Sequence, residues 1–223
     1  LTRAKRSTCG AGSETRGLFF GANTPTRYRD IDYITIASKG NASEFGELAV
    51  DVGSSQGASS DDMGGCSSPI RSFCFGTGGT TNVIQYVTTA TLGNSQDFGD
   101  LTQGNVRFPS GCSSTTRGLS GGGVSPSDDV NIIEYFTMAT LGNASNFGDL
   151  VEARQQLSAA SSHTRGLFAG GYDYPVTWNI IEKVEIATTG DATDFGDLTY
   201  SGQTNGASKY FSACSDCNGG LAT

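Results

Sequence analysis

Glu44-Phe45-Gly46-Glu47-Leu48 returns in near-identical form three more times along the chain. The later copies are Asp97-Phe98-Gly99-Asp100-Leu101, Asn146-Phe147-Gly148-Asp149-Leu150 and Asp194-Phe195-Gly196-Asp197-Leu198. The intervals between the four phenylalanines are 53, 49 and 48 residues. A period near 50 residues is typical of proteins that copy one small structural unit along the chain. We therefore expect four copies of one unit.

Three further elements precede this Phe-Gly motif in each copy. Residues 15–21, 70–76, 116–122 and 164–171 form the second element, and residues 31–36, 84–88, 133–138 and 181–186 form the third. Both are rich in β-branched and aromatic residues with partial alternation, which predicts strands. Small residues predict a crowded first strand at 7–9, 65–68, 111–114 and 159–162. Gly followed by Asn or Asp, as at Gly93-Asn94, suits the tight hairpin between the third and fourth strands.

Four short antiparallel strands in about 50 residues are typical of one β-propeller blade. The sequence therefore predicts an all-β propeller domain over 1–223. Its blades are expected at about 1–50, 51–102, 103–151 and 152–199, followed by one closing strand within 200–223. No stretch has convincing helical periodicity, and residues 150–160 are expected to form a connection plus a strand.

The closing strand predicts that the chain does not complete a ring by itself. Cys214-Ser215-Asp216-Cys217 aligns with the first strand that starts near Cys112, but no second, third or fourth strand follows it. The three missing strands would precede Leu1 in a longer parent chain that forms a larger ring. The alternative is a closed four-bladed ring with a frayed tail, which is at the small end of the known range.

The composition excludes several function classes. The formal net charge is −8, which argues against nucleic acid and anionic membrane as partners. No run of 18 apolar residues is present, so no segment is expected to insert into a membrane. Charged residues make up only 16% of the chain and glycines number 32, a mixture that suits short strands joined by tight turns.

Residues that carry catalysis are sparse, and the sequence predicts no enzyme and no cofactor. His163 is the single histidine, and no nucleophile stands on a strand-to-helix elbow. The glycine run 121–123 lacks the strand-to-helix context of a phosphate loop.

Six cysteines are present, and three of them, Cys66, Cys112 and Cys214, share one repeat position. Equivalent positions in neighbouring blades are expected to be too far apart for a disulfide, so small buried hydrophobic residues are the expectation. Cys214 and Cys217 have the spacing of half a zinc site, but no second pair matches them, and no metal is expected. The sequence leaves open whether these two are oxidised.

The four elements resemble the kelch repeat. That repeat has a small-residue strand, a strand ending in Gly-Gly, an alternating strand and a strand with a large aromatic residue. The double glycine is matched by Gly78-Gly79, Gly121-Gly122 and Gly170-Gly171, whereas Gly21-Ala22 departs from it. Phenylalanine stands where the kelch fourth strand usually carries Trp. The chain is therefore expected to be kelch-like.

The sequences of the repeats are also similar to repeats in structural proteins of tailed bacteriophages, including those of cyanobacteria. The similar phrases are Thr-Arg-Gly-Leu-Phe-Ala-Gly-Gly from Thr164, Asn-Ile-Ile-Glu from Asn131 or Asn179, and Gly-Asn-Ala-Ser-Asn-Phe-Gly-Asp-Leu from Gly142. This resemblance implies a non-enzymatic virion component of a tail or fibre. Its partners would be other virion proteins, further blades of the parent chain, or a host receptor or glycan.

The loops between the second and third strands vary most, and two of them carry aromatic and charged residues. The candidate binding residues are Arg27, Tyr28 and Arg29 in the first blade and Tyr172, Tyr174 and Trp178 in the fourth. A rigid scaffold with variable aromatic loops is a usual binding surface. The alternatives are sequence drift in tolerant loops, or a secreted carbohydrate-binding propeller. A lectin should repeat the same pocket residues in each blade, and these loops differ.

Two sets of charged residues recur at fixed repeat positions. The arginine column is Arg16, Arg71, Arg117 and Arg165, and the acidic column is Glu47, Asp100, Asp149 and Asp197. Isolated charges beside strands packed on two faces would be costly, whereas guanidinium and carboxylate groups satisfy each other. The sequence predicts an Arg–carboxylate contact within or between blades that fixes their register. The alternative is that both columns face solvent.

Overall fold

The computed structural model describes residues 1–5, 8–23, 27–49, 63–76, 82–104, 106–125, 128–199 and 212–213. Within these residues the chain forms strands and no helix, so the prediction of an all-β protein is confirmed for them. The predicted closing strand in 200–223 lies outside the described residues except for 212–213.

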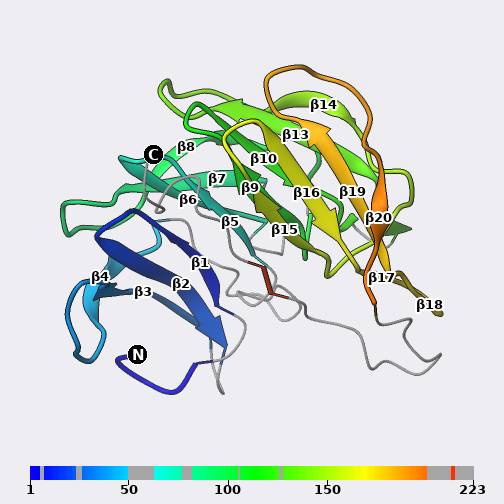
Figure 1. The fold of residues 1–223 in the computed structure, drawn as a ribbon. Helices are drawn as coiled ribbons and strands as arrows, with labels where there is room; N and C mark the ends of the chain where they lie inside the picture. The colour runs from blue at the N-terminus through cyan, green and yellow to red at the C-terminus, as the bar shows by residue number, and fades with distance from the viewer. Residues whose placement is uncertain are drawn as a thin grey trace.

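The strands form four sheets of four strands, one for each copy of the repeat (Figure 1). Repeat 1 contains β1 (Cys9–Gly12), β2 (Arg16–Asn23), β3 (Arg27–Thr35) and β4 (Ser43–Glu47). Repeat 2 contains β5 (Gly64–Ser67), β6 (Arg71–Phe75), β7 (Val83–Thr88) and β8 (Gln96–Asp100). Repeat 3 contains β9 (Ser110–Ser113), β10 (Arg117–Gly121), β13 (Ile132–Thr137) and β14 (Ser145–Asp149). Repeat 4 contains β15 (Ser158–Ser161), β16 (Arg165–Ala169), β19 (Ile180–Glu185) and β20 (Thr193–Asp197).

Each sheet is antiparallel, and its strands lie side by side in chain order. Repeats 3 and 4 also carry a small hairpin between their second and third strands. These hairpins are β11 (Val124–Ser125) with β12 (Asp128–Asp129), and β17 (Tyr172–Asp173) with β18 (Val176–Thr177).

The Phe-Gly motif forms a β-bulge in every repeat. In repeat 1, Ile31 lies opposite Gly46 and the next residue, Asp32, lies opposite Glu44, so Phe45 is the extra residue. The same register shift occurs in the other three repeats. Because the bulged residue is left out of the ladder of its own sheet, its backbone is free to bond elsewhere.

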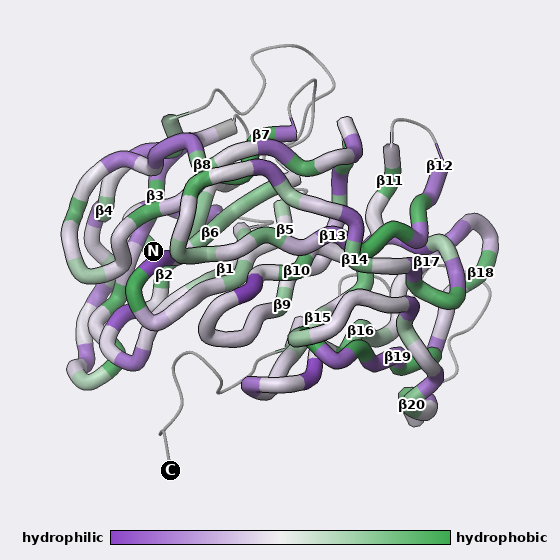
Figure 2. Tube along the Cα trace, turned by 90° about the horizontal axis from the view of Figure 1, so that it is seen from above, coloured by the Kyte–Doolittle hydropathy of each residue, from purple (hydrophilic) through white to green (hydrophobic). Residues whose placement is uncertain are grey.

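The four repeats form a row in chain order. The first strands contact one another in the sequence β1, β5, β9 and β15. Repeats 1 and 4 lie at opposite ends of this row in both views (Figures 1 and 2). Among the described strands, no contact of comparable extent joins β1 to β15.

The first strand of repeat 1 differs from its prediction. It was expected at 7–9, but β1 covers Cys9–Gly12, and Ala11 lies opposite Leu18 as Cys66 lies opposite Phe73. Small residues carry no alternation between apolar and polar positions, so the sequence does not fix the phase of this strand.

The hydrophobic core consists of three clusters, and each one joins two consecutive repeats. Leu18 and Phe45 of repeat 1 share a cluster with Val87 of repeat 2. The second cluster extends from repeat 2 to repeat 3, and the third extends from repeat 3 to repeat 4. We call the contact between consecutive repeats a seam. The apolar surface of each sheet is therefore buried mainly against its neighbour.

Candidate functional site

Each seam is built around the bulged Phe-Gly pair and the turn of the following repeat, which is Gly-Asn at the first two seams and Gly-Asp at the third. At the first seam, Gly93 N donates to Phe45 O at 2.9 Å, and Ser95 N donates to Glu47 O at 2.9 Å. The Asn94 side chain adds a third hydrogen bond to this seam, because its Oδ1 accepts from Glu47 N at 3.0 Å. The other two seams repeat all three bonds through Phe98, Asp100, Gly142, Asn143 and Ala144, and through Phe147, Asp149, Gly190, Asp191 and Ala192.

The glycine of the Phe-Gly pair allows this close approach. A Cβ atom on Gly46, Gly99 or Gly148 would lie 2.2–2.3 Å from the carbonyl oxygen of the facing turn glycine. That distance is far below any real Cβ contact, so a side chain at these positions would push two backbones apart.

The phenylalanine fills the apolar part of the seam. Phe45, Phe98 and Phe147 are each 3% exposed. At the second seam, Phe98 packs against Phe136 of the next repeat with ring centroids 5.5 Å apart. Burial of a large aromatic side chain contributes roughly 2–3 kcal/mol, which makes this residue a principal source of seam stability.

The arginine column joins repeats through carbonyl groups. Arg71 Nη1 donates to Met138 O at 2.8 Å and to Ala139 O at 3.1 Å, and its guanidinium lies 4.8 Å from the centroid of the Tyr86 ring. Arg117 makes the same two bonds to Ile186 and Ala187 while stacking on Tyr135, and Arg16 bonds Thr89 O while stacking on Tyr33.

The predicted contact between the arginine and acidic columns is therefore wrong. One member of each column does form an ion pair, but with a residue outside the other column. Arg165 pairs with Glu185 at 2.8 Å, and Glu47 pairs with Arg29 at 3.1 Å. The register explains the error. Arg16 lies opposite Thr35 at the end of β3, whereas Glu47 lies opposite Asp30 near its start. Five residues of strand separate the two columns by roughly 17 Å, which is too far for any direct contact.

A buried polar position in the third strand was not predicted. The residues that share this position are Asp32, Gln85, Glu134 and Glu182, each at most 3% exposed. Glu134 and Glu182 accept bonds from the segment that connects the preceding repeat to their own. Glu134 Oε1 accepts from Thr102 N at 2.7 Å, and Glu182 Oε1 accepts from Arg154 Nη1 at 2.6 Å. The signal was present, because each third element expected from the sequence begins with an Ile that is followed directly by a polar residue, as at Ile31-Asp32 and Ile181-Glu182.

In repeat 1, residues near the N-terminus supply the partners of this buried polar position. Asp32 accepts from Thr2 N at 3.1 Å and forms an ion pair with Lys5 at 3.0 Å. Burial tends to raise the pKa of Asp32, but the hydrogen bonds from Thr2 and Lys5 and the charge of Lys5 bring it below its ordinary value. Burial raises the pKa of Glu134, and the backbone and hydroxyl donors of Thr102 and the backbone N–H of Gln103 oppose the shift.

The two ends of the row present unfilled halves of a seam. On repeat 4, Phe195 is 52% exposed, and a Cβ on Gly196 would meet nothing within 4 Å. On repeat 1, Ile36 is 55% exposed, whereas its equivalent Ile186 is 1% exposed. Asn41, in the turn that other repeats use as the receiving element, is exposed, and Ala42 is half-buried.

The predicted loop residues of repeat 4 are only partly on the surface. Tyr174 is 82% exposed at the tip of the β17–β18 hairpin, and Tyr172 packs edge-on against it with centroids 6.4 Å apart. Tyr172 and Trp178 are half-buried. The Trp178 backbone N–H donates to Gly171 O at 3.0 Å, which ties the end of the hairpin to its start.

The predicted loop residues of repeat 1 belong to β3. Arg29 is half-buried and pairs with Glu47, and the guanidinium of Arg3 lies 4.2 Å from the centroid of the Tyr28 ring. Arg27 is the first residue of β3, and its side chain lies outside the described part of the structure. The two sets of loop residues are on repeats at opposite ends of the row, so they do not form one surface.

Two carboxyl groups meet where the hairpins of repeats 3 and 4 adjoin. Burial, a hydrogen bond from Asp173 and the charges of Asp173 and Asp128 raise the pKa of Asp129 to about 6. Gln155 Nε2, which donates to Asp129 Oδ1 at 2.8 Å, opposes the shift. The pair is therefore strained when both groups are ionised.

This pair predicts a pH-dependent contribution to stability. The pKa of Asp129 is raised in the folded state, so the fold binds a proton more tightly than the unfolded chain does, and stability falls as pH rises from about 4 through about 6. Asp173→Asn should raise the melting temperature above pH 7, and the gain should disappear below about pH 4. Asp97→Asn, on an exposed residue, controls for the change in net charge. A gain independent of pH would contradict the coupling.

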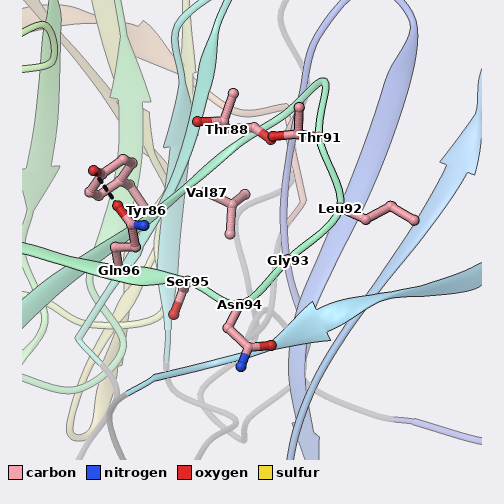
Figure 3. Close-up of a pocket in the computed structure, with 9 residues that line it drawn as sticks. All are labelled: Tyr86, Val87, Thr88, Thr91, Leu92, Gly93, Asn94, Ser95 and Gln96. Atoms are coloured by element: carbon pink, nitrogen blue, oxygen red, sulfur yellow. Dashed lines mark hydrogen bonds between the residues drawn. The ribbon is translucent and has the colours of Figure 1, made fainter.

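A hollow of about 590 Å³ lies beside the turn between β7 and β8 (Figure 3). At one end of it, Tyr86 and Gln96, which are paired on β7 and β8, are joined by a side-chain hydrogen bond of 2.7 Å. The lining residues are Tyr86, Val87, Thr88, Thr91, Leu92, Gly93, Asn94, Ser95 and Gln96. They include hydroxyl and amide groups but no carboxylate, imidazole, thiol or amine, and four of them, Val87, Gly93, Asn94 and Ser95, belong to the first seam.

Within the described residues, no group of three or more His, Cys, Asp or Glu residues is placed to hold a metal ion. Cys9, Cys66, Cys74 and Cys112 are buried. Cys214 and Cys217 lie outside the described residues. Across the part of the chain that the structure describes, no helix is long and apolar enough to cross a membrane.

Fold and seams together define a repeat protein of four-stranded antiparallel sheets. No protein-family model matches its sequence, and no curated protein matches it significantly.

Proposed function

We propose that the chain is a segment of a kelch-like β-propeller that acts, without catalysis, as a scaffold for protein–protein assembly in a virion. Each four-stranded sheet would be one blade of a larger ring. The observation that carries this proposal is the pair of unfilled seam halves on repeats 1 and 4, where Phe195 and Ile36 leave apolar surface in solvent. Exposed apolar surface that is buried at every equivalent position is typical of an assembly interface.

The virion setting is supported by the resemblance of the repeat sequences to structural proteins of tailed phages. Carbohydrate binding has weaker support, because the loops between second and third strands differ from one repeat to the next. The proposal is tested by immunogold labelling of purified particles from the source of this chain. Label on a tail or fibre is the expected result, and particles that lack the chain would overturn the virion assignment.

The β17–β18 hairpin is a second contact surface in this proposal. Tyr174→Ala should weaken adsorption of such particles to their host at least tenfold, because a rigid exposed tyrosine supplies contact area at little entropic cost. Its effect on the free energy of unfolding should stay within about 0.5 kcal/mol, as for other exposed positions. Trp178→Ala is the matched comparison, because its half-buried side chain should contribute to stability as well. Normal adsorption by the Tyr174 variant would remove the hairpin from the binding surface.

A further inference from the structure

We propose that the exposed edge of repeat 4 docks on the exposed edge of repeat 1 of a second copy of this chain, and forms there the same seam that joins repeats within the chain. The inference rests on the proposed function in treating the two ends of the row as assembly surfaces. Its occupant is specific: a second copy, bound head to tail.

The edge of repeat 4 keeps the Phe-Gly pair and the leucine of the first half of a seam, although Lys183 stands at the position of Tyr135. Phe195 and Gly196 occupy the positions of Phe147 and Gly148, whose side chain and Cα lie against the next repeat. Phe195 is 52% exposed, whereas Phe147 is 3% exposed. Leu198 is half-buried at the position where Leu150 is 2% exposed. This edge is therefore a preformed half-seam that no described residue of another repeat covers.

The edge of repeat 1 keeps the groups of the second half. Gly40-Asn41-Ala42 stands at the position of Gly93-Asn94-Ser95, which supplies two backbone donors and one amide acceptor to the first seam. Asn41 is exposed and Ala42 half-buried, whereas the equivalent Ala144 and Ala192 are 7% and 6% exposed. Ile36 lies where Met138 and Ile186 are buried.

The arginine column supplies a further match. Arg71 and Arg117 donate to two consecutive carbonyl groups of the next repeat, whereas Arg165 is exposed and pairs with Glu185 of its own sheet. The carbonyl groups equivalent to those acceptors belong to Ile36 and Ala37, on the open edge of repeat 1. Docking would place the Arg165 guanidinium on them.

The two edges cannot meet within the described arrangement of one chain, because repeats 1 and 4 lie at opposite ends of the row (Figures 1 and 2). Two copies joined at both pairs of edges would contain twice four repeats, and eight is within the usual range of propeller blades. A head-to-tail contact of this kind closes into a ring if the rotation per copy permits it, and otherwise continues into a filament.

The test uses two variants that each block one edge. Phe195→Lys places a charge at the centre of the repeat-4 edge and leaves repeat 1 intact. Ala42→Arg places a long side chain in the receiving turn and leaves repeat 4 intact. Native mass spectrometry and sedimentation velocity then report the association of wild type, of each variant and of an equimolar mixture.

We expect the wild type to form dimers or longer assemblies at micromolar concentration, and each variant alone to associate at least 100-fold more weakly. The mixture should give a one-to-one heterodimer through the two intact edges, and the double variant should stay monomeric. Gly196→Ala replaces Phe195→Lys if the latter fails to show the native circular dichroism spectrum.

A wild type that stays monomeric to about 100 µM would overturn the inference, and so would a single variant that still forms homodimers. A mixture without heterodimer would do the same. These outcomes leave the immunogold test untouched, so a monomeric chain found in particles would refute the second copy alone. A dimeric chain that is absent from particles would instead refute the virion assignment.

Discussion

Gly148→Ala is expected to lower the free energy of unfolding by about 3 kcal/mol, because the new methyl group would enter the backbone of the next repeat. Its Cβ would lie 2.3 Å from the carbonyl oxygen of Gly190 and 2.4 Å from the carbonyl carbon. Neither atom can rotate away as the end of a side chain could. Relief would need the third seam to open, which would expose Phe147 and Ile186. Denaturant unfolding of the purified chain measures the loss.

Gly196→Ala is the matched control for this prediction. Its φ of 145° is close to the 154° of Gly148, so both variants carry the same kind of backbone strain. In the monomeric chain, at concentrations too low for association, the alanine at 196 would meet nothing within 4 Å. The difference between the two variants therefore isolates the clash at the seam. Equal losses would mean that backbone strain alone explains the effect and that the seam is softer than its geometry indicates.

Glu182→Leu is expected to cost about 3–5 kcal/mol, because it leaves the buried guanidinium of Arg154 without its carboxylate. Both side chains are fully buried, and Nη1 and Oε1 are 2.6 Å apart. Arg154 also donates to the carbonyl groups of Glu152 and Gly170, so it cannot turn toward solvent without losing these bonds. The melting temperature and the denaturant midpoint should both fall.

Glu185→Leu provides the comparison on the same strand. Glu185 pairs with Arg165 at 2.8 Å, but both side chains are more than half exposed, and such pairs contribute about 0–1 kcal/mol. The double variant Arg154→Met with Glu182→Leu should recover most of the stability, because well-packed apolar residues often replace a buried ion pair without loss. Similar losses at positions 182 and 185 would contradict the assignment of this pair as a buried structural link.

The sequence predicts the number of sheets because the Phe-Gly motif is needed in every repeat. Phe45 has to bulge out of its strand and Gly46 has to admit the next backbone, so both residue types recur and the period is visible. The first strand was placed less well, since Ala11 and its small neighbours give no alternation that would fix the phase.

The sequence shows where charged residues recur, but it does not show which groups they contact. The arginine and acidic columns recur once in every repeat, which suggested that they pair. They lie on the second and fourth strands, however, beside opposite ends of the third strand. The polar residues that follow the first Ile of each expected third strand looked like the outer side of an alternating strand. In a row of sheets that pack on both faces this side is buried too, so Glu134 and Glu182 became anchors for the connecting segments.

The seams have a consequence for how the molecule comes apart. Each repeat exchanges its stabilising contacts only with its neighbours, so stability is close to a sum over adjacent pairs and opening starts most easily at an end of the row, where one neighbour is missing. Cys9 lies in repeat 1, inside the first seam, and burial raises the pKa of its thiol to about 12. Because alkylating reagents attack the thiolate, this sulfur stays inert while repeat 1 is closed and becomes a natural reporter of fraying at that end.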